Sequence, residues 1–143
     1  MGIHLIKLVV GLSTVEEFVQ NQPHYLVDYR GQKANVVTTR HRPKQAEALL
    51  ADGSLYRVMK NTIVFRQKII GFEETELPEK GRMCLIMCDP EIIRTLPTPR
   101  RPFQGWRYLK GEDAPQDLGR ISSGDTESGD PELAQMLRAA GIL

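Results

Sequence analysis

The chain has 143 residues, of which 41% are hydrophobic and 26% are charged. These proportions are those of an ordinary globular protein, and they exclude a fibrous repeat or a wholly disordered chain. The longest uninterrupted apolar run, Met83 to Cys88, has six residues, whereas a membrane-spanning helix needs about 20. The first residues also lack the pattern of a secretory or lipidation signal. We therefore expect a cytoplasmic protein with no membrane partner.

The N-terminal part of the chain combines a strand pattern with a helix pattern. Residues 3–10 are mostly apolar and end in β-branched side chains, which predicts a largely buried strand. A capping box from Ser13 to Glu16 then predicts the start of a helix. Pro23 must interrupt or kink that helix, and we expect its continuation to end at Gly31.

The middle of the chain places a second helix between strand patterns. Residues 34–40 are rich in β-branched side chains and predict a strand. Pro43 suits the first turn of a helix and Gly53 suits its end, so a helix is expected between them. The alternation of residues 54–77 predicts two strands joined near Asn61, or one long bent strand.

The last part of the chain begins with a strand pattern and ends in acidic sequence. Residues 83–88 are apolar on both faces and predict a central strand, and residues 89–96 predict a single helical turn. Prolines at positions 97, 99 and 102 argue against a regular helix or an inner strand, so we expect an extended segment. Residues 111–130 predict a flexible acidic linker, and residues 131–143 predict a short amphipathic helix.

These patterns together predict the fold class. Residues 1–110 are expected to form one α+β domain, with a small mixed or antiparallel sheet, or a half-open barrel, of about five strands flanked by two helices. Cys84 and Cys88 would lie roughly 13 Å apart in a strand, too far for a disulfide. The histidines add no metal-binding pattern, so we predict buried reduced thiols and no cofactor.

Charge is distributed unevenly although the whole chain carries a net charge of only +1. Residues 1–39 contain three basic and three acidic side chains, residues 40–110 fourteen and eight, and residues 111–143 two and seven. The three parts therefore carry net charges of 0, +6 and −5. A basic body favours a polyanionic partner, while an acidic tail favours a protein partner or competition for the basic face.

Three segments of the chain resemble DUF1489, a bacterial family of unknown function: "IHLIKLVVG", "GSLYRVMKNTIVFRQKIIGFEE", and "RPFQGWRYL" followed by "DAPQDL". The likeness runs in order from Ile3 to about Leu118 and implies no established activity. A weaker likeness, to small RNA-binding barrels of the pseudouridine-synthase-and-archaeosine-transglycosylase (PUA) type, rests on "PKQAEALLADG" preceding "VFRQKIIGFEE". By analogy, it implies a barrel-like sheet and an RNA partner.

The segment "PRRPFQGWRYL" is the first candidate binding site, because it combines arginines with the only tryptophan. Arg100, Arg101 and Arg107 suit phosphate groups, and Trp106 suits stacking on a base. The alternative is that the aromatic rings complete the core while the arginines form surface ion pairs. We expect the rings to be structural, because a lone tryptophan brings a large apolar surface to a core of this size.

A second candidate site surrounds the start of the helix predicted at Pro43. Arg40, Arg42 and Lys44 flank that start, where unpaired backbone N–H groups already favour an anion. A docked phosphate and an unoccupied, solvated basic turn are equally good interpretations of this cluster.

A third candidate site lies on the strands of residues 54–77. Lys60, Arg66 and Lys68 would point to one face of an uninterrupted strand, but a turn at Asn61 would cancel that inference. The simpler interpretation is the solvated face of a half-buried sheet.

No motif indicates catalysis, and we predict no catalytic residue. The leading hypothesis is a non-enzymatic module whose basic face binds RNA or another phosphate-bearing ligand. The first alternative is a small phospholigand-binding protein or enzyme with a pocket near Arg40 to Lys44. The second alternative is an adaptor that binds a protein through its acidic tail.

Overall fold

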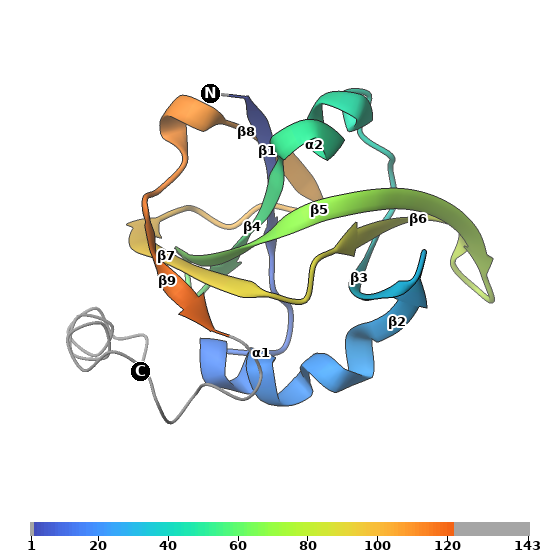
Figure 1. Ribbon diagram of the computed structural model, residues 1–143, viewed down its shortest axis with the longest axis horizontal. Helices are drawn as coiled ribbons and strands as arrows, with labels where there is room; N and C mark the ends of the chain where they lie inside the picture. The colour runs from blue at the N-terminus through green and yellow to red at the C-terminus, as the bar shows by residue number, and fades with distance from the viewer. Residues whose placement is uncertain (1, 122–143) are drawn as a thin grey trace.

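Nine strands and two α-helices form the described part of the chain, residues 2–121, in the computed structural model (Figure 1). The helices are α1 (Val15–Asn21) and α2 (Ala46–Asp52), with 3-10 turns η1 (Gln22–Tyr25) and η2 (Gly111–Asp113). The strands are β1 (Ile3–Leu8), β2 (Leu26–Tyr29), β3 (Gln32–Thr39), β4 (Ser54–Met59), β5 (Thr62–Leu77), β6 (Gly81–Cys88), β7 (Ile92–Pro99), β8 (Trp106–Lys110) and β9 (Asp117–Ile121).

The strands form one large open sheet in the hydrogen-bonded order β2-β3-β6-β5-β4-β1-β8, with β7 paired to β5 and β9 paired to β7. Only the pairing of β1 with β4 is parallel, and every other pairing among the described strands is antiparallel. The predicted α+β class with two helices and a mixed, mostly antiparallel sheet is therefore confirmed. The prediction of about five strands was wrong, because several loops expected from their prolines and polar residues are strands.

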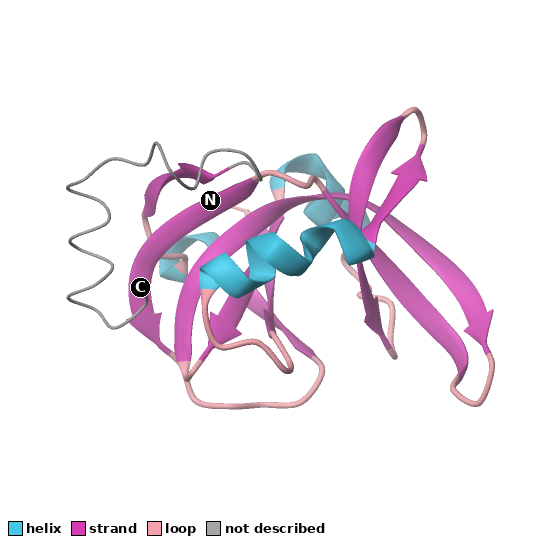
Figure 2. Cartoon of the chain, turned by 90° about the horizontal axis from the view of Figure 1, so that it is seen from below, coloured by secondary structure: helices cyan, strands magenta, loops and turns pink. Residues whose placement is uncertain are grey.

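The long strand β5 makes the sheet bend. Its first half pairs with β4 and β7, whereas its second half pairs with β6. The register with β6 shifts between Ile69 and Gly71. A Cβ at Gly71 would lie 2.1 Å from the hydroxyl of Tyr29, so glycine there lets the Tyr29 ring of β2 lie against this bend, and a larger residue would make that ring shift. The β5–β6 hairpin extends beyond the rest of the sheet in Figure 2.

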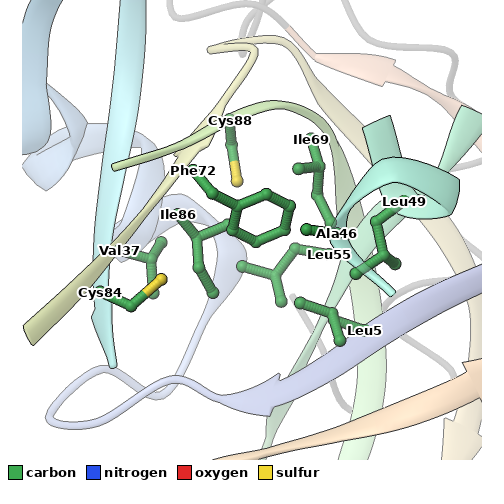
Figure 3. Packing of buried hydrophobic residues seen from close by; sticks show 10 residues of the cluster. All are labelled: Leu5, Val37, Ala46, Leu49, Leu55, Ile69, Phe72, Cys84, Ile86 and Cys88. Atoms are coloured by element: carbon green, nitrogen blue, oxygen red, sulfur yellow. The ribbon is translucent and has the colours of Figure 1, made fainter. Parts of the chain in front are cut away.

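Two helices cover the bent sheet on opposite sides of β5 (Figure 1). Helix α2 contributes Ala46 and Leu49 to a cluster of ten buried side chains, and the other eight come from β1, β3, β4, β5 and β6 (Figure 3). Helix α1 presents Val15, Phe18 and Val19 to Phe65 and Ile92. Burial of each such side chain contributes roughly 1.5–3 kcal/mol, so these two clusters hold the sheet in its curved form.

The first helix begins one residue later than predicted. Thr14, not Ser13, is the N-cap: its side chain accepts from the N–H of Glu17, and the Glu17 carboxylate accepts from the N–H of Thr14. The Ser-Thr pair followed by two glutamates fits the capping-box spacing in both registers, and the apolar face of the helix selects the second.

The segment after Pro23 is not a continued helix. Pro23 lies in η1, and residues Leu26–Tyr29 form β2, which turns back into β3. The turn uses Arg30 and Gly31, both with positive φ, as two-residue hairpins require. Gly31 therefore serves a hairpin where the sequence suggested the end of a helix.

Residues 92–99 form strand β7 and not a helical turn. Pairing with β5 on one side and β9 on the other outweighs the weak helical pattern. The prolines are tolerated because β9 pairs only with the first half of β7, up to Thr95. Pro97 and Pro99 therefore lie where that side of the strand is an edge and needs no backbone donor.

Other local predictions agree with the structure. A two-residue turn at Lys60 and Asn61, both with positive φ, joins β4 to β5 as expected. Gly53 ends α2, and a Cβ there would lie 2.6 Å from the carbonyl oxygen of Leu49. Cys84 and Cys88 are free and buried on the central strand β6, and burial raises the pKa of the Cys88 thiol to about 12.

Part of the predicted acidic linker, residues 111–130, lies in the described region. There the chain forms η2 and then β9, which pairs with β7 and belongs to the same sheet. The rest of the predicted linker and the predicted helix at residues 131–143 lie outside the described residues.

Candidate functional site

A groove lies where the wall formed by β1 and β8 faces the end of β3. Its volume is about 530 Å³, and its lining includes four cations, Lys7, Arg40, Lys80 and Arg107. No acidic residue of the described chain lines this groove. We call it the basic groove. Its walls come from parts of the chain far apart in sequence, which only the bend of the sheet brings together.

Strand pairing positions the cations of the basic groove. In the antiparallel register of β1 with β8, Lys7 lies opposite Trp106, and Ile6 lies opposite Arg107. On the other wall, the guanidinium of Arg40 donates to the carbonyl oxygen of Lys80 at 2.7 Å. This bond ties the end of β3 to the β5–β6 turn and brings the backbone of Lys80 beside Arg40.

Trp106 is part of the groove wall and is fixed there. Its indole N–H donates to the carbonyl oxygen of His41 at 2.8 Å. Its ring packs edge-on against Tyr108, whose hydroxyl accepts from the N–H of Gln45 at 3.1 Å. The half-buried ring also packs on the cluster beneath α2. The expectation that this ring is structural is therefore supported, although the ring also lines the groove.

A second hollow has a volume of about 400 Å³. It is lined by Arg100, Arg101, Phe103 and Arg107 together with two prolines, and Arg107 belongs to both hollows. The guanidinium carbons of Arg100 and Arg107 lie 5.6 and 5.5 Å from the centre of the Phe103 ring. Cation–π contacts of this kind hold an arginine without neutralising its charge.

Six cations line the two hollows, and we call this set the basic strip: Lys7, Arg40, Lys80, Arg100, Arg101 and Arg107. Within residues 2–121, none of these six side chains forms an ion pair. The alternative that the arginines of residues 100–107 form surface ion pairs is not what the described chain shows. In the described part of the chain, no carboxylate neutralises these charges.

Lys60, predicted as a site residue, lies beside the basic strip. It is exposed in the β4–β5 turn, and the carbonyl oxygen of Asn61 accepts from the N–H of Arg100 at 2.7 Å. The turn separates Lys60 from Arg66 and Lys68, so the three do not share one strand face. The turn at Asn61, which would cancel the predicted third site, is therefore present.

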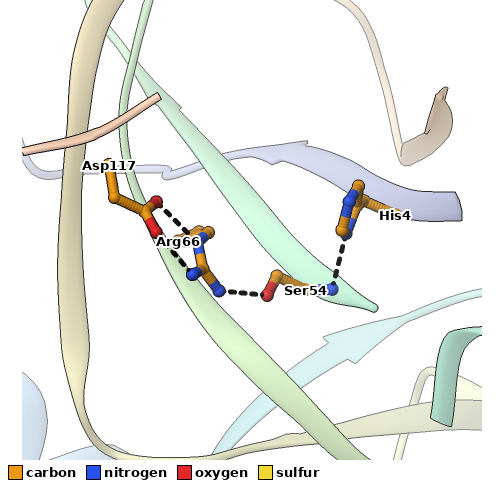
Figure 4. A network of polar contacts seen from close by, with 4 residues as sticks. All are labelled: His4, Ser54, Arg66 and Asp117. Carbon is orange, nitrogen blue, oxygen red and sulfur yellow. Dashed lines mark hydrogen bonds and ion pairs between the residues drawn. The ribbon is translucent and has the colours of Figure 1, made fainter. Parts of the chain in front are cut away.

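Arg66 is occupied by a structural role. It binds the carboxylate of Asp117 through two bonds of 2.8 and 2.7 Å and donates to the Ser54 hydroxyl at 2.7 Å (Figure 4). The N–H of Ser54 in turn donates to Nδ1 of His4 at 3.0 Å. Burial lowers the pKa of His4, and the nearby Arg66 lowers it further. Lys68 is exposed beside Asp89 and Glu91, in a mixed-charge hollow.

Arg42 and Lys44, the other predicted residues at a helix start, are exposed but do not line the basic groove. The guanidinium carbon of Arg42 lies 5.6 Å from the centre of the Phe72 ring. Helix α2 begins at Ala46, three residues after Pro43, and has only seven residues and no side-chain cap. The start of helix α2 therefore does not bring the predicted cations Arg40, Arg42 and Lys44 together around a phosphate site. Arg40 joins the strip through its bond to the β5–β6 turn.

Sequence reasoning missed three cations. Lys7 lies within an apolar strand pattern, and Lys80 lies in a turn, so neither stands in a basic cluster. Arg57 looked like a residue on the polar face of β4, but all six residues of that strand are buried. Its side chain lines a separate cavity of about 550 Å³, which Lys7 also lines. Only the pairing of β1 with β4 and β8 reveals that Lys7 stands between the two cavities.

Within residues 2–121, no group of three or more histidine, cysteine, aspartate or glutamate side chains is placed to hold a metal ion. None of the described helices is both long and apolar enough to cross a membrane.

The fold and site thus define an α+β domain with a basic strip whose six cations form no ion pair within residues 2–121. The chain belongs to the family described as Protein of unknown function (DUF1489), whose model matches residues 5–143. The match confirms the resemblance seen in the sequence and also includes the acidic C-terminal part. Searches of curated proteins and of solved structures find no significant match.

Proposed function

We propose that this protein is a binding module that holds RNA along the basic strip. The observation that carries the proposal is the convergence of six cations, from four separate parts of the chain, on hollows that no described acidic side chain lines. Contacts between such cations and phosphates supply most of the sequence-independent affinity of nucleic-acid-binding proteins.

The arrangement of the cations supports a polymer more than a compact ligand. The cations line two hollows that share Arg107, so they do not all surround one point. Cations spread over two hollows suit the repeated phosphates of a single strand, and a base could stack on the exposed part of Trp106, a contact worth roughly 1–3 kcal/mol. The preference for RNA over DNA rests on the resemblance to PUA-type barrels, which is an analogy.

The test is fluorescence anisotropy of a labelled, mixed-sequence RNA pool at several salt concentrations. For single strands, the slope of log K against log salt is about −0.7 for each phosphate that is neutralised. We expect a steep slope and affinity that rises with RNA length until the strip is covered. Failure to detect binding at low salt would contradict the proposal.

Arg107→Gln is the sharpest single variant, because Arg107 lines both hollows. It should weaken RNA binding and reduce the slope by about 0.7. Arg30→Gln is the matched control, because Arg30 is an equally exposed arginine that lies on the β2–β3 turn and pairs with Glu73. Equal effects of the two substitutions would mean that the strip is not the binding surface.

A second candidate function is the binding of a small phosphate compound in the basic groove alone. Its volume of about 530 Å³ lies within the range of roughly 300–1,000 Å³ for small-molecule sites. Competition separates the two functions: a mononucleotide that displaces long RNA at similar concentration favours the small ligand. The adaptor hypothesis concerns residues 111–143, most of which lie outside the described chain, and stays a prediction.

A further inference from the structure

Another cavity lies between the end of β1, the β3–β6 pair and helix α1, and the inference drawn from it does not rest on the proposed RNA binding. Its volume is about 550 Å³, within the range of small-molecule sites. Apolar side chains dominate its lining, and these include Leu8, Phe18, Val36 and Met87. Two cations, Arg57 and Lys7, are its only charged lining residues in the described chain apart from the titratable His24.

Arg57 is a buried cation for which the described residues supply no carboxylate partner. Its side chain is only 5% exposed, on a central strand, and it forms no ion pair with any carboxylate within residues 2–121. It donates from Nε to the carbonyl oxygen of Lys7 at 3.3 Å and from Nη2 to that of Leu8 at 3.1 Å. Burial of an unpaired charge is costly, so proteins normally pair or coordinate such a group.

The guanidinium keeps donors for a ligand. An arginine has five N–H donors, and two of them bind the carbonyl oxygens of β1. Nη1 has no acceptor among the described residues, and the side chain lines the cavity. Burial lowers the pKa of Arg57 to about 10, which leaves the group a cation at neutral pH. The backbone bonds fix its position, so the remaining donors are preorganised for a planar anion.

We propose that this cavity binds an organic monocarboxylate with an apolar body, whose carboxylate pairs with Arg57 and whose body lies against the apolar lining. A carboxylate matches the two-pronged end of a guanidinium, and Lys7, which lies opposite Arg57 in the β1–β4 pairing, adds a second positive charge to the lining. An apolar body fits the rest of the lining. A phosphate suits this cavity less well, because the apolar walls offer few further donors.

The rim of the cavity supports the same ligand class. Val10, Tyr25 and Val27 are among the lining residues and are 88%, 40% and 40% exposed. Large apolar side chains exposed together are unusual on a protein surface and often mark a ligand groove. A ligand tail that leaves the buried end would cover them.

Calorimetric titration of the full chain with octanoate tests the proposal, with octanamide and acetate as matched probes. Octanamide has the tail without the charge, and acetate has the charge without a tail. We expect one octanoate per chain, bound at least about tenfold more tightly than either control, a ratio that corresponds to about 1.4 kcal/mol. No measurable octanoate binding overturns the proposal, and so does equal affinity for octanamide or for acetate.

Two kinds of variant locate the site. Arg57→Gln should weaken octanoate binding by about tenfold or more while the circular dichroism spectrum stays that of a folded chain. Because Arg57 is buried and its loss could unfold the chain, Val10→Glu and Val10→Lys give an independent test at an exposed position. The glutamate variant should weaken octanoate binding and the lysine variant should strengthen it. A folded Arg57→Gln that binds normally, or equal binding by the two Val10 variants, overturns the assignment.

The outcome is independent of the RNA proposal. Arg101→Gln alters the basic strip but does not touch this cavity, so it should leave octanoate affinity unchanged. A protein that binds octanoate but no RNA would retain this inference and refute the other.

Discussion

Two regions of the molecule contain arginines that look alike in the sequence and differ in the fold. In the first region, Arg66 of β5 donates two hydrogen bonds to Asp117 of β9 and one to Ser54 of β4, so it links three strands. Along the basic strip, Arg100, Arg101 and Arg107 face no carboxylate within residues 2–121, and two of them lie over a phenylalanine ring. A basic residue therefore serves stability where a carboxylate lies within reach, and it is available to a ligand where aromatic or apolar side chains surround it.

The largest expected effect comes from removing the charges of the unpaired region. The triple variant Arg100→Gln, Arg101→Gln and Arg107→Gln should weaken RNA binding by about a hundredfold, because each charge-assisted contact contributes roughly 1 kcal/mol. The salt slope should become shallower by about 2. Fluorescence anisotropy measures the affinity and the salt slope. The free energy of unfolding, measured in urea, should change by less than about 0.5 kcal/mol. A large loss of stability would show that these arginines are structural, as Arg66 is, and the two regions would then not differ.

The paired region should show the opposite behaviour. Arg66→Gln should lower the free energy of unfolding by about 1–2 kcal/mol, because it removes a charge-assisted bidentate contact that is only partly shielded from solvent. Urea unfolding of this variant, of Asp117→Asn and of the double variant completes a cycle that isolates the pair. RNA affinity should stay within about twofold of the unaltered chain. A marked loss of RNA binding would place Arg66 in the interface.

Acid should weaken the paired region selectively through His4. Burial, and then Arg66, lowers the pKa of His4 below its ordinary value of 6.5 in the folded chain. The unfolded chain therefore binds a proton more readily, so stability contributed by neutral His4 is present above pH 6.5 and is lost as the pH falls below it. Between pH 7.5 and pH 5, the free energy of unfolding should decline less for His4→Asn than for the unaltered chain. Identical declines would exclude His4 as the source.

The smallest expected effect distinguishes two exposed lysines. Lys60 lies in a turn beside Arg100, whereas Lys68 lies beside Asp89 and Glu91. Lys60→Gln should weaken RNA binding by about two- to threefold, and Lys68→Gln should leave it unchanged, because exposed charges act mainly within a Debye length of about 10 Å. Parallel anisotropy titrations at low salt compare them. A larger effect of Lys68→Gln would extend the interface to the hollow beside Asp89 and Glu91.

Local signals in the sequence predicted much of the fold. The β4–β5 hairpin, the central strand β6 and the α+β class follow from periodicity and turn residues that act over a few positions. Predictions failed where distant pairing outweighed a local pattern. Residues 26–29 and 92–99 are strands because β3 and β5 offer them partners, which no short window of sequence contains.

The candidate site was predicted only in part. The two hollows are lined by five predicted residues, Arg40, Arg100, Arg101, Trp106 and Arg107, but not by the other five, Arg42, Lys44, Lys60, Arg66 and Lys68. Lys7 and Lys80 complete the strip although neither belongs to a basic cluster in the sequence. The signal for them was absent, because a single lysine in a strand or a turn is ordinary.

By itself the sequence determined the α+β class, the basic middle of the chain and the buried thiols, because composition and short-range periodicity fix burial and local backbone geometry. Only the tertiary structure decided which cations are neutralised, since Coulomb interactions depend on distance in space and not along the chain. The bend at β5 brings Lys7, Arg40 and Arg107 around one groove. The same packing buries Arg57 beside an apolar cavity, where its charge lacks a carboxylate partner within residues 2–121.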